Sequence, residues 1–277
     1  MRPPIEGCVL ITGASSGIGR ELARQVAGRC RALVLVARRR AELEELAGEL
    51  RGLHPKLLIQ LEVCDLVVDA EVEAMLASVE RGVGAVDVLI NNAGFGDLSL
   101  FDLSEAGRAA RMIDLNVRVL TALTHRLVRP MVERQRGGIL NVSSGFGMAF
   151  LPGLAVYIAT KHYVTGFTEA LRLDLEGTGV VVSQVCPGPV ATEFADQAGN
   201  FTGMDTPAIL TIGAEQCARE TLAGFELGRA MIFPGFVNRL MMFFNNISPR
   251  FVRRLIGAAA SPKLRAMQLA ARSSGRP

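Results

Sequence analysis

The sequence predicts an α/β fold in which helices cover both faces of a parallel sheet. Short apolar runs alternate with longer segments whose apolar residues recur at helical spacing, which is the pattern of β-α-β units. The apolar runs are continuous in Val, Ile and Leu, as in strands buried on both faces. No internal repeat or low-complexity linker interrupts this pattern. We therefore expect one doubly wound domain, whose ligands lie beyond the carboxyl ends of the strands.

The alternation predicts a seven-stranded sheet and six crossover helices. The strands are expected at residues 8–12, 32–37, 56–63, 86–91, 138–143, 180–186 and 230–233. The helices are expected at residues 17–29, 39–52, 68–82, 104–134, 154–177 and 213–227. Glycines in "EGTGV" are a typical stop for the fifth helix. Residues 1–235 form the expected domain, and residues 236–277 form a basic amphipathic helical extension that is not an independent domain.

Length and composition exclude several classes of protein. The chain has 277 residues, 49% hydrophobic and 21% charged, as expected of a globular protein with a sizeable core. No apolar run approaches the roughly 20 residues of a membrane-spanning helix, and "CVLIT" near the N-terminus is interpreted as a strand rather than a signal peptide. The five Cys and three His lack metal-ligand spacing, so we expect reduced thiols, no metal site and a cytoplasmic protein.

A glycine-rich segment, "ITGASSGIGRELA", follows the first expected strand and opens a helix. Gly13, Gly17 and Gly19 allow the backbone to turn tightly and approach a pyrophosphate, whose charge a helix N-terminus favours. Glycine triplets also occur in ordinary strand-to-helix turns, and this spacing differs from G-x-G-x-x-G. The strand-loop-helix context predicts a Rossmann-type dinucleotide site with contacts from Gly13, Ser15, Ser16, Gly17, Ile18 and Gly19.

The end of the second strand predicts which dinucleotide binds. An acidic residue there favours a free ribose 2′-hydroxyl, whereas Arg favours a 2′-phosphate. The chain reads "VARRR", with Ala37 at the acidic position and Arg38 after it. Because a guanidinium donates paired, charge-assisted hydrogen bonds to phosphate, we expect NADP(H) to be preferred over NAD(H). Arg39 and Arg40 are also explained as a solvated charge run at a helix start.

The stretch "VYIATKHYV" contains both tyrosines, Tyr157 and Tyr163, and also Lys161, one of three lysines in the chain. A spacing of four places Tyr157 and Lys161 side by side on one helix face. A nearby ammonium favours the phenolate and is expected to lower the pKa of the tyrosine toward the range useful for general acid–base catalysis. The alternative is an exposed aromatic side chain beside a surface cation.

Six motifs together resemble those of the short-chain dehydrogenase/reductase family. They occur in that family's order and spacing: "TGASSGIG" (12–19), "NNAG" (91–94), Asn116 in "DLNV", "NVSS" (141–144), "YIATK" (157–161) and "PGPVAT" (187–192). The similarity runs through about residues 5–235. Six ordered motifs are far more specific than any single one.

The resemblance implies roles for individual residues. Its implied catalytic residues are Asn116, Ser144, Tyr157 and Lys161: Tyr157 gives a proton to the substrate carbonyl, Ser144 hydrogen-bonds the reacting oxygen, Lys161 binds the nicotinamide ribose, and Asn116 holds a water that links Lys161 to solvent. Ser143 is interpreted as structural, and Tyr163 as part of the core or the helix surface. Further cofactor contacts are implied by the resemblance: Asp65 with the adenine amino group, Asn91, Ala93 and Gly94 near the ribose on the adenosine side, and Pro187, Gly188, Val190 and Thr192 with the nicotinamide carboxamide.

The implied reaction is hydride transfer from NADPH to a ketone without a metal. Two alternatives stay open: alcohol oxidation on the same scaffold, and a non-catalytic regulatory protein that binds the cofactor. The loop "GFGMAFLPGL" (145–154) and the expected lid at 189–212 contain many apolar residues and no Arg or Lys. We therefore expect a hydrophobic ketone, such as a 3-oxoacyl chain, a steroid-like ring or another lipid. The lid residues taken to shape its pocket are Phe194, Phe201, Met204, Ile209 and Leu210.

The C-terminal segment differs physically from the body. Residues 229–277 contain nine Arg or Lys and no Asp or Glu, whereas residues 1–228 hold 21 basic and 27 acidic groups. An apolar stripe at helical spacing comprises Phe236, Leu240, Phe243, Phe244 and Ile247, and Phe251 and Leu255 continue it. The stripe indicates packing or oligomerisation, as in a homodimer or homotetramer, or peripheral contact of residues 236–272 with a membrane. Because the body is acidic, we expect no nucleic-acid partner.

Overall fold

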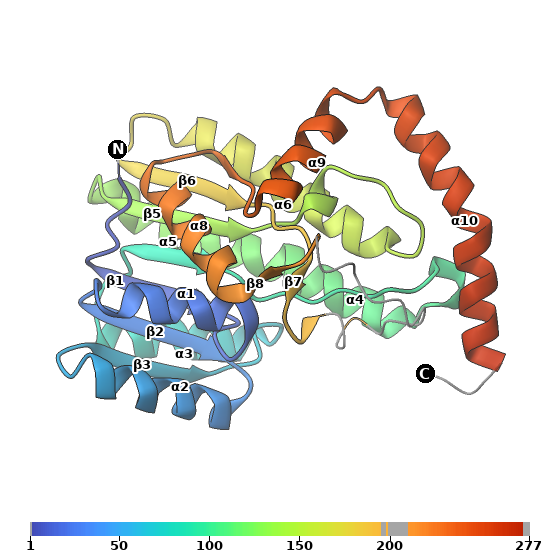
Figure 1. Ribbon diagram of the computed structural model, residues 1–277. Coiled ribbons are helices and arrows are strands. Elements are labelled where there is room, and N and C mark those ends of the chain that lie inside the picture. Colours follow the sequence, from blue (N-terminus) through green and yellow to red (C-terminus); the bar gives the residue numbers. More distant parts are fainter. Residues whose placement is uncertain (1, 195–197, 199–209, 274–277) are drawn as a thin grey trace.

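The computed structural model describes residues 2–194, 198 and 210–273. Its main sheet has seven parallel strands in the order β3-β2-β1-β4-β5-β6-β9 (Figure 1). Their bounds are β1 Cys8–Thr12, β2 Ala32–Ala37, β3 Leu58–Val63, β4 Val88–Asn91, β5 Gly137–Val142, β6 Val180–Val185 and β9 Met231–Ile232. The seven-stranded doubly wound fold predicted from the sequence is confirmed. The strand order reverses between β1 and β4, which is where ligands bind in such sheets.

Helices cover both faces of this sheet. On one face lie α1 (Gly17–Ala27), α2 (Arg40–Leu53) and α8 (Ala214–Glu226), which share an apolar core with the strands. On the other face lie α3 (Asp69–Gly82), α5 (Leu120–Glu133) and α6 (Ala155–Asp174), with a second core. The central strands β1 and β2 are buried at every position, which explains their continuous apolar sequence.

The helix expected at 104–134 is divided into three parts. It consists of α4 (Ala106–Ile113), a π-helical stretch at Asp114–Val119 and α5. A 3₁₀ turn at Phe101–Leu103 precedes it. The wider π turn contains Asn116, one of the predicted site residues, and such turns occur frequently at functional sites.

A second, two-stranded sheet lies beyond the carboxyl end of β6. It pairs β7 (Val190–Ala191) with β8 (Ile212–Gly213) in parallel. This pairing ties the start of the expected lid to its end. Phe201, Met204 and Ile209 of the lid lie outside the described residues.

Two helices form the C-terminal extension. They are α9 (Phe236–Ile247) and α10 (Arg250–Ser273), and α10 stands beyond the loops that follow β4 and β5 (Figure 1). Near its C-terminal end, Arg265 of α10 pairs with Asp102 at 2.6 Å, and Gln268 Oε1 accepts a hydrogen bond from Leu100 N. Within the described ranges, no helix has the length and hydrophobicity needed to span a membrane.

Candidate active site

The glycine-rich loop joins β1 to α1 and borders the cleft at the carboxyl ends of the strands. Gly13 and Gly17 have φ values of 66° and 54°, a region that disfavours residues with a Cβ atom. A Cβ atom at Gly17 would lie 3.1 Å from the methyl group of Thr192. Gly17 and Thr192, both predicted cofactor contacts, therefore face each other across a narrow gap. Ser16 occupies the N-cap position of α1 without a capping hydrogen bond from its side chain, and Ile18 packs against the core.

Two residues that the sequence analysis did not single out fix this loop in place. Thr12 Oγ1 accepts hydrogen bonds from the backbone nitrogens of Asn92 and Ala93, both at 3.0 Å. The Asn92 side chain in turn donates to the carbonyl oxygens of Thr12 at 2.9 Å and Gly13 at 3.0 Å. The "TG" and "NNAG" motifs are thus one hydrogen-bonded unit, which the separation of β1 and β4 in the sequence concealed.

Asn91 lies at the end of β4 and was predicted to contact the ribose. Its side chain is 3% exposed and donates to Thr124 Oγ1 and Asn141 Oδ1, both at 2.9 Å. These partners lie on α5 and β5, within the layer between sheet and helix. The side-chain nitrogen of Asn91 is therefore engaged in the interior, and we expect any contact of Asn91 with a ligand to come from its backbone atoms.

Three arginines follow β2, and they differ in their surroundings. Arg38, the predicted 2′-phosphate ligand, is exposed, and Arg40 lies near Glu44 on the surface of α2. Arg39 points to the glycine-rich loop, since its guanidinium lies 3.3 Å from Ser15 Oγ. It also pairs with Glu193 of the "PGPVAT" loop region at 3.1 Å. The interpretation of Arg39 as a solvated charge was incomplete, because composition alone does not show which arginine reaches the loop.

Asp65 lies just beyond β3, beside the end of β2. Its Oδ1 accepts a hydrogen bond from Val67 N at 3.3 Å, and its Oδ2 is 3.7 Å from the guanidinium of Arg111. The side chain is partly exposed. This placement at the same sheet edge as Arg38 is compatible with the predicted contact to an adenine ring.

Ser144, Tyr157 and Lys161 are all buried, with 7%, 6% and 7% exposure. Ser144 lies two residues after β5 and caps a 3₁₀ turn, Gly145–Gly147, by accepting a hydrogen bond from Phe146 N at 3.2 Å. Lys161 Nζ donates to the carbonyl oxygen of Val142 at 2.8 Å and lies 5.7 Å from the centre of the Tyr157 ring. The structure therefore brings together three of the four predicted catalytic side chains, from the segment after β5 and from α6.

The pKa of Tyr157 shifts in the direction opposite to the one expected from the sequence. Burial raises the pKa of Tyr157 to about 12, and a hydrogen bond with the Ser144 side chain only partly opposes this effect. Burial also lowers the pKa of Lys161 to about 8. The cost of placing a charge in an apolar site outweighs the attraction expected between ammonium and phenolate. In the chain alone, Tyr157 is therefore a protonated phenol at neutral pH.

Asn116 connects the π turn to the loop after β4. Its amide accepts from Phe95 N at 3.2 Å and donates to Phe95 O at 3.0 Å and to Thr160 Oγ1 at 3.1 Å. Thr160 in turn donates to the Tyr157 carbonyl oxygen at 2.8 Å. A Cβ atom on Gly94 would lie 2.9 Å from Asn116 Oδ1 and 3.7 Å from Lys161 Nζ. Gly94, Asn116 and Lys161, all predicted site residues, thus lie together, and Thr160 joins them.

Ser143, although adjacent to Ser144, bonds to α6 rather than facing the cleft. Its hydroxyl contacts Thr165 Oγ1 at 2.8 Å and Lys161 O at 3.2 Å. This geometry agrees with the structural role expected for Ser143. The exposed Tyr163 contacts the Thr121 hydroxyl at 2.9 Å and stacks on Phe167.

The "PGPV" loop is held from two sides. The Pro187 carbonyl oxygen accepts a hydrogen bond from Gly145 N at 2.9 Å, next to Ser144. From α9, the Asn238 side chain donates to Cys186 O at 3.0 Å and to Pro234 O at 3.2 Å. Gly188 lies beside Asn238, and Val190 begins β7. The extension therefore supports the loop that was predicted to contact nicotinamide, a role that the sequence motifs did not indicate.

Apolar side chains surround the ring of Tyr157. Phe194 lies 5.6 Å and Phe146 6.3 Å from it, measured between ring centres. Phe95 and Leu98 pack against the same buried cluster. One charged pair lies nearby: Arg108 and Asp97 are 3.3 Å apart, and burial raises the pKa of Asp97. The immediate surroundings of the phenol ring are thus largely apolar.

A comparison of the sequence with models of known families identifies the family of this chain. The sequence model described as short chain dehydrogenase matches residues 7–202, well over half of the chain. The chain belongs to the short-chain dehydrogenase/reductase family. It is accordingly an oxidoreductase of that family, as the resemblance implied.

Several short-chain dehydrogenases/reductases are similar over most of their length. Sulfoacetaldehyde reductase of Chromohalobacter salexigens is 41% identical over 190 residues, 68% of this chain and 74% of the relative. A short-chain dehydrogenase from Sphingobium yanoikuyae in complex with NADPH has a TM-score of 0.76 at 29% identity, covering 88% of this chain and 97% of the other. The bulky-bulky ketone specific alcohol dehydrogenase from Comamonas testosteroni has a TM-score of 0.72 at 25% identity, covering 88% and 95%.

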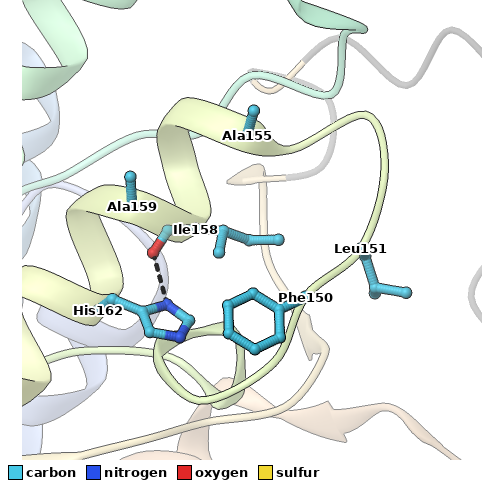
Figure 2. A pocket seen from close by; sticks show the side chains of 6 residues that line it. All are labelled: Phe150, Leu151, Ala155, Ile158, Ala159 and His162. Carbon is cyan, nitrogen blue, oxygen red and sulfur yellow. Dashed lines mark hydrogen bonds between the residues drawn. The ribbon is translucent and has the colours of Figure 1, made fainter. Parts of the chain in front are cut away.

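A separate hollow of about 310 Å³ lies on α6 and the preceding loop (Figure 2). It is lined by Phe150, Leu151, Ala155, Ile158, Ala159 and His162. The α6 residues among these recur at helical spacing on a different face from Tyr157 and Lys161. Figure 2 shows His162 facing Phe150, and the two rings stack with centres 5.2 Å apart. This hollow is therefore distinct from the site around Tyr157.

No metal centre is indicated by the part of the chain that the structure describes. Those residues contain no group of three or more His, Cys, Asp or Glu side chains arranged to hold an ion. The five cysteines are unpaired thiols, of which Cys186 is buried next to the site. Burial raises the pKa of Cys186 to about 12, so its thiol is not a ready nucleophile.

Proposed function

We propose that this short-chain dehydrogenase/reductase reduces a hydrophobic ketone to a secondary alcohol with NADPH, and that Tyr157 donates the proton. The observation that carries the proposal is the environment of the Tyr157 phenol. It is protonated, hydrogen-bonded to the Ser144 side chain, buried among aromatic rings and adjacent to Lys161. Tyr157 therefore carries a proton at neutral pH, and because a general acid is most efficient when its pKa lies near the working pH, we expect the Lys161 ammonium to stabilise the phenolate once the cofactor and the substrate are bound.

Each side chain has a defined part in the proposed reaction. The reduced nicotinamide, when bound, supplies the hydride. Ser144 and Tyr157 donate hydrogen bonds to the ketone oxygen, which orients it and stabilises the developing alkoxide until the Tyr157 proton is transferred. The Lys161 ammonium holds the ribose and favours the phenolate that remains. Asn116, hydrogen-bonded to Thr160 and near Gly94, keeps the Lys161 end of the site in order, and we expect it to hold the water that would link Lys161 to solvent.

Alcohol oxidation is the alternative direction. It uses the same residues, with the Tyr157 phenolate as the base, and the ratio of reduced to oxidised cofactor decides between the two directions. A non-catalytic cofactor-binding protein is disfavoured because Ser144, Tyr157 and Lys161 are all present in one buried cluster.

We propose a hydrophobic substrate because Phe146 and Phe194 lie beside the Tyr157 ring, and Phe95 and Leu98 pack against the same buried cluster. The test is a panel that pairs bulky apolar ketones with small aldehydes carrying a sulfonate or carboxylate, the class named for the Chromohalobacter relative. With NADPH, kcat/KM is expected to rise with the apolar size of the ketone. Highest kcat/KM for the charged aldehydes would contradict the proposed substrate class while leaving the reductase chemistry intact.

NADP(H) is the proposed cofactor, because Arg38 is exposed at the end of β2 and Arg39 reaches Ser15 of the glycine-rich loop. We expect both guanidinium groups to contact the 2′-phosphate of the cofactor. Arg38→Asp is expected to raise KM for NADPH by about 10- to 100-fold, since one charge-assisted contact is replaced by repulsion. Initial rates with NADPH and NADH measure the effect, and Arg40→Asp, on the exposed side of α2, is the matched control. Unchanged preference in Arg38→Asp would refute this assignment.

We further propose a cytoplasmic homodimer or homotetramer in which residues 236–277 remain part of the same folded unit. The exposed residues of α6, including Tyr163 at 40% and Leu173 at 73% exposure, support a subunit contact. Sedimentation equilibrium tests the assembly, and a monomeric mass at micromolar concentration would contradict it.

A further inference from the structure

The helix α9 presents its apolar side to solvent. Its exposed side chains are Phe236 at 75%, Leu240 at 46%, Phe243 at 58%, Phe244 at 54% and Ile247 at 61%. A helix that packs on its own domain normally turns its apolar stripe toward the core. The stripe predicted from the sequence therefore exists, but it does not pack on the body of this chain.

The inner side of α9 is instead held by polar contacts. Asn238 is buried and bonds to Cys186 O and Pro234 O, and Asn245 donates to Met148 O at 2.8 Å. Met242 is also buried and lies against Gly145. These contacts fix the rotation of α9 about its axis, so its outward apolar face is a defined surface.

The same arrangement continues along α10. Phe251 and Leu255 are one turn apart, and Leu269 lies 18 residues after Phe251, which is five full turns. Their exposures are 63%, 65% and 48%. On the opposite side, Arg253 donates to Met148 O at 2.9 Å and Gln268 is buried at Leu100 N. We use the name outer face for the exposed apolar side chains of the two helices. They are Phe236, Leu240, Phe243, Phe244 and Ile247 of α9, and Phe251, Leu255 and Leu269 of α10.

The charges around the outer face have one sign. Residues 229–277 contain nine Arg or Lys and no Asp or Glu. Arg239 and Arg265 pair with Glu220 and Asp102 of the body. Arg250, Arg254 and Lys263 are exposed. The segment that carries the apolar surface is thus basic, whereas residues 1–228 are net acidic.

We propose that the outer face docks on the surface of an anionic lipid membrane. A basic amphipathic helix can bury its apolar side chains at the boundary of headgroups and acyl chains while its cations contact anionic headgroups. This inference goes beyond the proposed reaction and does not depend on it.

A second copy of the chain fits the outer face less well. A twofold contact places the same surface of each copy against itself. The exposed basic groups would then face one another, and residues 229–277 supply no acidic side chain to pair with them. An anionic bilayer would bury the exposed Phe side chains, and its headgroups would pair with the basic side chains.

Docking there would bring one end of the molecule to the membrane. The helix α10 is attached to the loops after β4 and β5 through Asp102 and Met148 (Figure 1). Those loops also carry Phe95 and Phe146, which pack around Tyr157. If the proposed ketone reduction holds, the substrate class would include ketones dissolved in the bilayer.

Vesicle co-sedimentation of the full chain tests the docking. The probes are phosphatidylcholine vesicles and vesicles of equal parts phosphatidylcholine and phosphatidylglycerol. We expect binding to the anionic vesicles and more than about tenfold weaker binding to phosphatidylcholine alone. Phe243→Asp combined with Ile247→Asp is expected to weaken binding to anionic vesicles by more than about tenfold, because two charges would enter the apolar layer.

The matched control is Leu53→Asp combined with Leu227→Asp. These residues are 67% and 64% exposed at the ends of α2 and α8, outside the outer face, and the change in charge is the same. Thermal melting verifies that both double variants are folded. Absence of binding to anionic vesicles, or equal binding by both double variants, would overturn the proposal. Absence of binding together with a smaller oligomer for the outer-face variant alone would assign the face to a second copy, and would also overturn it.

Discussion

Replacing Tyr157 with Phe is expected to lower kcat for ketone reduction by about 10²- to 10⁴-fold, the range that one general acid contributes. The substitution removes the hydroxyl that is the proposed proton donor and keeps the ring that packs against Phe146 and Phe194. The fold and the binding of NADPH should therefore be retained. Steady-state kinetics gives kcat, and fluorescence titration gives the dissociation constant of NADPH.

The second tyrosine of the chain provides the control for this experiment. Tyr163 lies on the same helix, is 40% exposed and contacts the Thr121 hydroxyl. Tyr163→Phe also removes one phenolic hydroxyl, yet its turnover is expected to match that of the parent enzyme. Equal turnover of Tyr157→Phe and the parent would show that the proton comes from another group.

Replacing Lys161 with Met is expected to lower kcat/KM for ketone reduction by about 10²-fold or more. Methionine has a similar length and removes the buried ammonium that we propose holds the ribose and stabilises the phenolate. The donor to Val142 O is lost as well, so folding must be measured alongside turnover. Lys56→Met, at an exposed lysine, is the control and should leave kcat/KM unchanged.

The same variant gives a test of the buried charge. Burial lowers the pKa of Lys161 from 10.5 to about 8. Between these pH values the unfolded chain binds the Lys161 proton and the folded chain does not, so this residue makes the folding stability rise with pH. Urea unfolding measures the free energy of unfolding of the parent and of Lys161→Met at pH about 7 and about 10. The difference between the two proteins isolates the contribution of Lys161, because all other groups titrate in both. The parent should gain stability relative to the variant at the higher pH; a relative loss would show that burial does not lower this pKa.

The fold was predictable because its main signal is local. Strands such as β1 and β2 are buried along their whole length, so their apolar runs stand out without any knowledge of neighbours. The cluster of Ser144, Tyr157 and Lys161 was predictable for a different reason. Its members belong to motifs whose order and spacing are specific when taken together.

Other features depend on contacts between distant segments. The bonds of Asn92 to Thr12 O and Gly13 O, and of Asn238 to Cys186 O, join residues that no spacing rule connects. The contact of Arg39 with Ser15 likewise requires the positions of two loops. Sequence alone could not distinguish Arg39 from its two arginine neighbours.

Two further properties, the orientation of the apolar stripe and the pKa of Tyr157, could be determined only from the three-dimensional surroundings of the residues. The apolar stripe of the extension was visible in the sequence, but periodicity does not show whether a stripe faces the body or solvent, and Phe243 and Ile247 face solvent. The pKa of Tyr157 depends on the balance of burial and charge, which spacing does not give. Proximity of Lys161 indicated a lowered pKa, whereas burial raises it.

Hydride transfer is the central claim, and isotopic labelling tests it most directly. The enzyme is supplied with NADPH carrying deuterium at the transferable position of the nicotinamide and with the apolar ketone that has the highest kcat/KM, and the alcohol is examined by mass spectrometry. The account predicts one deuterium on the carbinol carbon in the parent enzyme and almost no labelled alcohol with Tyr157→Phe. Alcohol without deuterium, or no alcohol from any ketone although NADPH binds, would contradict it.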